Sequence, residues 1–100
     1  MTLGIIINTD RHLADISGIV KAAISKGHEV ILFSMDDGTR LIDNPEFTGL
    51  CKIKGITISF CTHSARHLDL ATEVLPTEIF SGSQYNNAIM VSKADRVIVL

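Results

Sequence analysis

The feature that most constrains the fold is a set of short runs rich in aliphatic and β-branched residues, of which Gly4 to Asn8 is an unbroken apolar one. They lie in Gly4 to Asn8, His28 to Ser34, Ile56 to Phe60 and Arg96 to Leu100. Strands with one solvated face alternate apolar and polar residues, whereas unbroken apolar strands are typical of parallel sheets covered by helices on both faces. The runs therefore predict buried strands of a mainly parallel sheet.

Helical segments are predicted between these strands. Residues 14 to 26 carry apolar side chains at helical spacing, and Gly27 provides the stop. Asn44-Pro45-Glu46 has the pattern of a cap followed by a first-turn proline, and it predicts a short helix that Gly55 ends. The polar residues 35 to 40, between the second strand and this helix, are expected to form a loop.

The second half of the chain gives weaker signals. Residues 64 to 73 have a weak helical register, and Leu75 to Phe80 is expected to be a short extended piece because Pro76 interrupts a helix. Tyr85 to Lys93 predicts a last helix with its inner side formed by Ala88, Ile89, Val91 and Ser92.

Strands and helices thus alternate along one predicted domain, residues 1–100. The expected fold class is α/β, a three-layer α/β/α sandwich around a mainly parallel sheet of about five strands. Right-handed crossovers place the carboxyl ends of all such strands at one edge, where open α/β sheets bind ligands. We expect the strand ends near Asn8, Ser34, Cys61 and Ser81 to meet there.

Composition and charge exclude several classes of protein. Nine basic and eleven acidic residues give a net charge of −2 without a Lys/Arg cluster, so we expect no nucleic acid partner. No apolar run approaches the roughly 20 residues of a membrane-spanning helix, and no basic leader precedes the first strand. With two cysteines and no secretory signal, the chain is expected to be cytoplasmic and reduced. It has no G-x-G-x-x-G motif, and we expect no cofactor.

Cys61 is the strongest candidate for chemistry because it ends a strand just before a predicted helix. A thiol at the start of a helix feels the positive end of the helix dipole, and His63, Arg66 or His67 could add positive charge. Both effects favour the nucleophilic thiolate. The alternative is that Cys61 is a small apolar residue filling the end of a buried strand. Cys51, on an amphipathic segment, is expected to pack in the core.

The sequence contains two weaker candidate sites besides this thiol. Cys61, His63 and His67 have a spacing that could hold zinc, although no second cysteine accompanies them, and we predict no resident metal. Asp37, in the acidic turn after the second strand, could line the site or contact a cation or a donor amine.

The chain resembles the DsrE/DsrF-like family of small α/β sulfur-relay proteins over nearly its whole length. The likeness rests mainly on Gly55 to Cys61, a β-strand that ends in cysteine, and on the closing segment Ala94 to Val99. The Asp-Gly loop after the second strand, which contains Asp36 and Gly38, matches as well.

This resemblance implies that Cys61 carries sulfane sulfur as a persulfide and passes it from a sulfur donor protein to an acceptor protein. Several members have a second cysteine where this chain has Ser64, and Arg66 lies slightly nearer the cysteine than the usual arginine. The family also implies a homo-oligomer, either a dimer, a trimer or a hexamer. Whether such a sulfurtransferase-type carrier counts as an enzyme stays open, as does a non-catalytic oligomeric binding module with a structural Cys61.

Overall fold

A five-stranded parallel sheet in the order β4-β3-β2-β1-β5 runs through the computed structural model, which describes residues 1–100. The α/β class and the parallel sheet predicted from the sequence are therefore confirmed. In chain order the elements, with η marking a 3₁₀ helix, are β1 (Thr2–Ile7), α1 (Leu13–Ser25), β2 (Glu29–Ser34), η1 (Asp36–Asp43), α2 (Pro45–Thr48), η2 (Gly49–Lys52), β3 (Ile56–Cys61), α3 (Thr62–His67), β4 (Ile79–Gly82), α4 (Gln84–Lys93) and β5 (Arg96–Val99).

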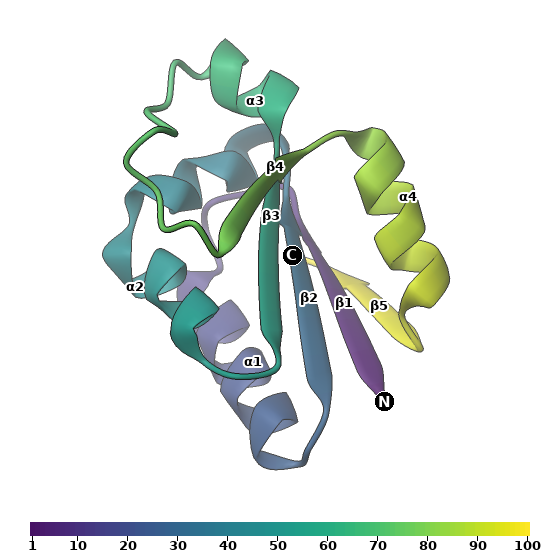
Figure 1. The fold of residues 1–100 in the computed structure, drawn as a ribbon. Helices are drawn as coiled ribbons and strands as arrows, with labels where there is room; N and C mark the ends of the chain where they lie inside the picture. Colours follow the sequence, from purple (N-terminus) through teal and green to yellow (C-terminus); the bar gives the residue numbers. More distant parts are fainter.

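Helices lie on both faces of the sheet, but unequally. Figure 1 shows α1 and α2 on one face, α4 alone on the other, and α3 at the carboxyl end of the strands. The strand order explains this: the chain moves outward from β1 to β4 and then returns past β1 to β5, so that α4 is the one helix that crosses on the second face.

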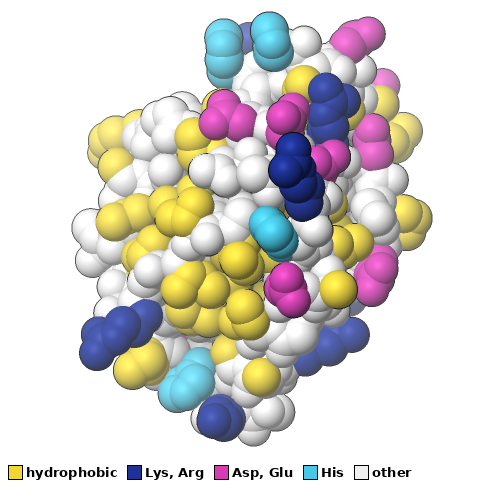
Figure 2. All heavy atoms as spheres, turned by 180° about the vertical axis from the view of Figure 1, so that it is seen from behind, with side chains coloured by type: hydrophobic (Ala, Val, Ile, Leu, Met, Phe, Trp, Pro, Cys, Tyr) yellow, Lys and Arg dark blue, Asp and Glu magenta, His cyan; other side chains and the backbone are white.

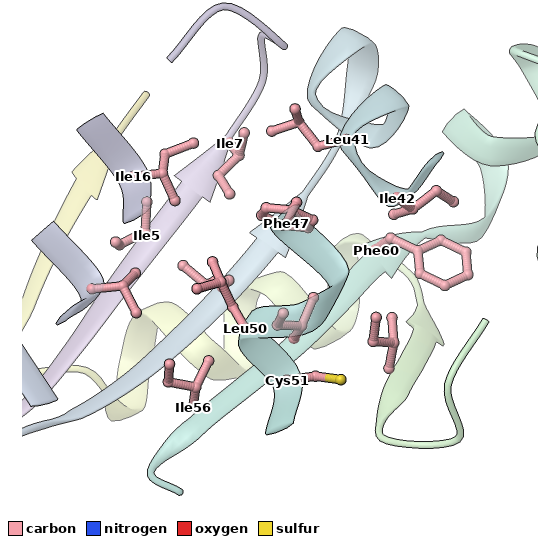
Figure 3. Close-up of a cluster of buried hydrophobic side chains, with 14 of the residues drawn as sticks. Ile5, Ile7, Ile16, Leu41, Ile42, Phe47, Leu50, Cys51, Ile56 and Phe60 are labelled. Atoms are coloured by element: carbon pink, nitrogen blue, oxygen red, sulfur yellow. The ribbon is translucent and has the colours of Figure 1, made fainter. Parts of the chain in front are cut away.

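The main core lies between the sheet and the α1 and α2 layer. It contains sixteen buried residues, among them alternate residues of the central strands such as Ile5, Leu32 and Ile58. Figure 3 shows Phe47 and Leu50 pointing into this cluster, with Cys51 at its side. The capping proposal for this region is confirmed, because the amide of Glu46 donates to the Asn44 side chain over 2.9 Å.

A smaller apolar cluster lies under α4. Its buried members are Phe33, Cys61 and Met90. Helix α4 comes close to the sheet at Gly4, where an added Cβ would meet the sulfur of Met90 and the Cβ of Ala94. Cys61 and Cys51 therefore pack in separate clusters on opposite faces of the sheet.

Two predictions about the C-terminal region were wrong. The last strand is a half-exposed edge rather than a buried strand: it pairs only with β1, and Val99 is 57% exposed, while Ile98 and Leu100 pack against the main core. On α4 the buried residue is Met90, while Ala88, Val91 and Ser92 are exposed and Ile89 is half-buried. A short helix on a sheet buries only one narrow row of side chains, here the row that contains Met90. The apolar residues of α4 are spread too widely around the helix for the sequence to identify that row.

Two further boundaries differ from the prediction. Residues 36 to 43 form η1 instead of a loop, because Leu41 and Ile42 are buried in the main core and hold the segment against the sheet. Helix α3 covers Thr62–His67 instead of 64 to 73, and Asp69, with a φ of 56°, turns the chain away shortly after it.

The helices are all short. The longest, α1, has 13 residues, fewer than the roughly 20 residues that a helix needs to cross a bilayer.

Candidate functional site

Cys61 occupies the junction between β3 and α3. It is the last residue of the strand and the N-cap of the helix, and it is paired in register with Gly82 at the end of β4. The hydroxyl of Thr62 donates to the carbonyl of Gly82 over 3.0 Å and so fixes the start of α3 against β4. The thiol lies at the carboxyl edge of the sheet, where sequence reasoning expected it.

An open hollow of about 750 Å³ lies over this junction, between α3, the end of β2 and the start of α4. The side chain of Cys61 is 5% exposed, so the thiol is recessed and reached through the hollow. The hollow brings together four of the five predicted site residues, Cys61, His63, Ser64 and Arg66. Its lining residues are Met35, Asp36, Cys61, Thr62, His63, Ser64, Arg66, Gly82, Ser83, Gln84 and Asn86.

Opposing effects act on the thiol. Burial raises the pKa of Cys61, but the Ser64 hydroxyl, the amides of Ser64 and His63 and the Gln84 side chain surround the sulfur, and together they lower that pKa below its ordinary value. The Cys61 side chain makes no capping hydrogen bond of standard geometry, so these are close polar contacts that favour the negative charge. None of the groups that lower this pKa is a cation, so the positive charge expected from His63, Arg66 or His67 does not contribute to it.

Ser64 links the thiol to the turn after β2. Its hydroxyl oxygen accepts a hydrogen bond from the amide of Asp36 over 3.0 Å, and Ser64 is itself buried. Because the oxygen is occupied by this donor, the hydroxyl proton is free to point elsewhere, including toward Cys61. Asp36 has a φ of 49°, in the left-handed region that Asp and Asn tolerate better than most residues.

The start of α4 contributes side chains that sequence reasoning did not identify. Ser83 caps the helix, and its amide donates to the Asn86 side chain over 2.8 Å. Ser83 and Asn86 form a capping box, in which each side chain bonds to the backbone near the other. It places Gln84 beside Cys61, and the Gln84 amide nitrogen lies 3.8 Å from the Met35 sulfur. The signal available in the sequence was a serine cap directly after a strand expected to end at the same edge.

The remaining predicted residue, Asp37, lies outside the Cys61 hollow. It lines a neighbouring hollow of about 500 Å³ with Arg40, His63 and His67, and it pairs with Arg40 over 3.4 Å. Figure 2, which views the molecule from behind, shows charged and histidine side chains gathered at this carboxyl end. No group of three or more His, Cys, Asp or Glu side chains comes together as a metal site, so the spacing of Cys61, His63 and His67 does not produce one.

Sequence comparisons give no match: no family model and no curated protein matches the chain. Solved structures match at the level of the fold. The YchN protein of E. coli has a TM-score of 0.76 at 13% identity, with 100% of each chain covered. MTH1491 from Methanobacterium thermoautotrophicum, a protein of unknown function, has a TM-score of 0.69 at 15% identity, covering 99% of this chain and 98% of that one.

These identities are low, so the matches establish fold alone. The resemblance of Gly55 to Cys61 and of Ala94 to Val99 to the DsrE/DsrF-like family, and the activity that it implies, stay predictions. The chain therefore has the α/β fold of YchN and MTH1491, with a recessed thiol at the carboxyl edge of its parallel sheet.

Proposed function

We propose that this chain is a single-cysteine sulfur carrier that holds sulfane sulfur as a persulfide on Cys61. The observation that carries the proposal is the position of Cys61: a thiol with a lowered pKa that lines an open hollow at the ligand-binding edge of the sheet. The sequence resemblance of Gly55 to Cys61 and of Ala94 to Val99 to the DsrE/DsrF-like family supports the specific chemistry.

Loading is a thiolate attack on a donor persulfide. The Cys61 thiolate attacks the terminal sulfur of R–S–SH; a bond forms between the two sulfurs, and the bond between the donor sulfurs breaks. The products are Cys61–S–SH and the donor thiolate R–S⁻, which takes a proton from water. The polar groups around Cys61 then stabilise the persulfide anion as they stabilise the thiolate.

Discharge requires a thiol from another molecule. Ser64 stands three residues after Cys61, and Cys51 packs in the core on the opposite face of the sheet. No second thiol of the chain is placed to form an internal disulfide with Cys61 and expel the sulfur as sulfide. A donor protein and an acceptor protein in a reducing cytoplasmic environment are accordingly the expected partners.

Self-association is part of the proposal. Helix α4 covers only part of its face of the sheet. Apolar side chains are exposed on both edge strands, Phe80 on β4 and Val97 and Val99 on β5. Exposed apolar groups on an unpaired edge strand favour contact with another chain. Light scattering after size exclusion tests for a homo-oligomer, and a monomer at all concentrations would contradict it.

The carrier function is tested by intact mass after incubation with a persulfide donor. Wild type and Cys51→Ser should gain the mass of one sulfur atom, and Cys61→Ser should gain none. The main alternative is a non-catalytic binding module in which Cys61 only packs against Phe33 and Met90. An adduct that persists in Cys61→Ser, or no adduct in wild type, would favour that alternative.

A further inference from the structure

The hollow over Cys61 also limits what kind of donor can reach the sulfur. Because the Cys61 side chain is only 5% exposed, the donor sulfur must enter on a slender group. A volume of about 750 Å³ lies within the range of pockets that hold small molecules. Only two of the eleven lining residues are hydrophobic, but most of the accessible lining surface is apolar, so a polar ligand would be recognised by a few polar groups.

Most polar groups of the lining already have partners within the protein. The Thr62 hydroxyl donates to Gly82, Ser64 accepts from the amide of Asp36, and Asn86 accepts from Ser83. The groups left for a ligand are therefore mainly the charged side chains at the mouth.

Two of these charges have opposite sign and no partner. Asp36 and Arg66 both line the hollow and are exposed, and neither forms an ion pair with any residue of the chain, although Asp36 also lines the neighbouring hollow. By contrast, Asp37 and Arg40 in the neighbouring hollow neutralise one another over 3.4 Å. One free carboxylate and one free guanidinium beside a nucleophilic sulfur match a ligand with one ammonium, one carboxylate and a sulfur.

We infer that the hollow accepts the persulfide of a small zwitterionic aminothiol, that of free cysteine being the simplest, as a direct sulfur donor to Cys61. The donor's ammonium group contacts Asp36, its carboxylate contacts Arg66, and its terminal sulfur meets the Cys61 thiolate. The reaction is the loading step above, with cysteine thiolate as the leaving group, so this inference rests on the proposed function.

The test uses four small persulfides chosen for the charges that they carry near the sulfur: those of cysteine, cysteamine, 3-mercaptopropionate and 2-mercaptoethanol. They carry both charges, the ammonium, the carboxylate and neither, respectively. Because the parent thiols differ as leaving groups, each donor's loading rate is compared between wild type and variant. Asp36→Asn keeps a residue that tolerates the positive φ, and Arg66→Gln keeps a good helix former.

The expected result is a pattern of selective losses. Asp36→Asn should slow loading from the cysteine and cysteamine persulfides by about two- to fivefold, as one exposed charge contact allows. Arg66→Gln should slow loading from the cysteine and 3-mercaptopropionate persulfides by about the same factor. The 2-mercaptoethanol persulfide should be unaffected in both variants.

Two matched controls remove the same charges elsewhere. Asp37→Asn changes the adjacent carboxylate, which lies outside the Cys61 hollow, and Lys54→Gln removes a cation from the chain just before β3, at the opposite end of that strand from Cys61. Neither control variant should slow loading from one donor more than from another.

Loading rates that are equal in wild type, Asp36→Asn and Arg66→Gln for all four donors, or slowed equally for all four, would overturn the zwitterion site and leave the carrier function standing. Wild type that takes sulfur from none of them would overturn both.

Discussion

The two cysteines of this chain lie on opposite faces of one sheet, and their environments differ in kind. Cys51 packs in the main core beside Phe47 and Leu50, and burial raises the pKa of its thiol. Cys61 is buried to a similar degree, yet the polar groups of α3 and Gln84 outweigh burial, and its pKa is lowered. Burial alone therefore does not set the direction in which a thiol pKa moves; the polar groups around the strand end at Cys61 reverse it.

The largest expected difference is in alkylation of the folded protein. Iodoacetamide should modify Cys61 at least about 100-fold faster than Cys51 at pH 7, because Cys61 lines an open hollow and its pKa is lowered, whereas Cys51 lines no hollow and its pKa is raised. The rate at Cys61 should rise with pH to a midpoint below the usual thiol value of about 8.5. Peptide mapping over a pH series measures both rates, and comparable rates would remove the contrast between the sites.

The core around Cys51 should control stability but not thiol chemistry. Phe47 is fully buried there, and Phe47→Ala should lower the free energy of unfolding by about 3–5 kcal/mol. Urea denaturation measures this loss. The pH midpoint for alkylation of Cys61 should stay unchanged in the variant that remains folded, and a shifted midpoint would mean that the two regions are coupled through the sheet.

The turn that supports Ser64 should be sensitive to added volume. Gly38 lies against the end of β1, where a Cβ would meet the carbonyl of Ile7, so backbone must move to admit Gly38→Ala. We expect a loss of about 1–3 kcal/mol by denaturation and a slower alkylation of Cys61, because the Asp36 amide moves with the turn. Gly18→Ala, on the exposed side of α1 with open space around it, is the matched control and should be harmless. Normal Cys61 reactivity in Gly38→Ala would show that the turn does not position Ser64.

The smallest expected effect is at Ser64. Ser64→Ala removes a group that lowers the pKa of Cys61, so the alkylation midpoint should move upward, toward the ordinary thiol value. It also leaves the Asp36 amide without its acceptor, which should cost about 1 kcal/mol of stability. The labelling rate of Cys51 in Ser64→Ala should differ from that in wild type only by the amount that the lower stability explains. An unchanged Cys61 midpoint would assign its activation to the backbone amides alone.

The sequence predicted the parts of the fold that depend on local pattern. Continuous apolar strands, the Asn44 cap and the stop at Gly27, with a φ of 83°, are each encoded in a few neighbouring residues. The exposure of β5 was not predictable in this way. Whether an apolar strand is central or at the edge depends on the strand order, which the chain's pattern does not contain.

In the candidate site, too, the residues close in sequence were predicted and those brought together by strand pairing were not. Cys61, His63, Ser64 and Arg66 are close in sequence, and their grouping followed from one strand-to-helix junction. Gln84 was missed because it reaches Cys61 only through the pairing of β3 with β4, which brings Gly82 beside the thiol. The acidic turn of Asp36 and Asp37 did not reveal which carboxylate faces Cys61: Asp36 lines the Cys61 hollow, whereas Asp37 lines only the neighbouring one.

The most direct test of the account is to locate sulfane sulfur on the two cysteines of one molecule. Wild type is loaded with a persulfide donor, freed of excess donor, alkylated so that thiols and persulfides are distinguished, and digested. The peptide that contains Cys61 should carry all the added sulfur, and the peptide that contains Cys51 should carry none. Sulfur on Cys51, or divided between the two, would contradict the claim that the strand end at Cys61 makes this chain a sulfur carrier.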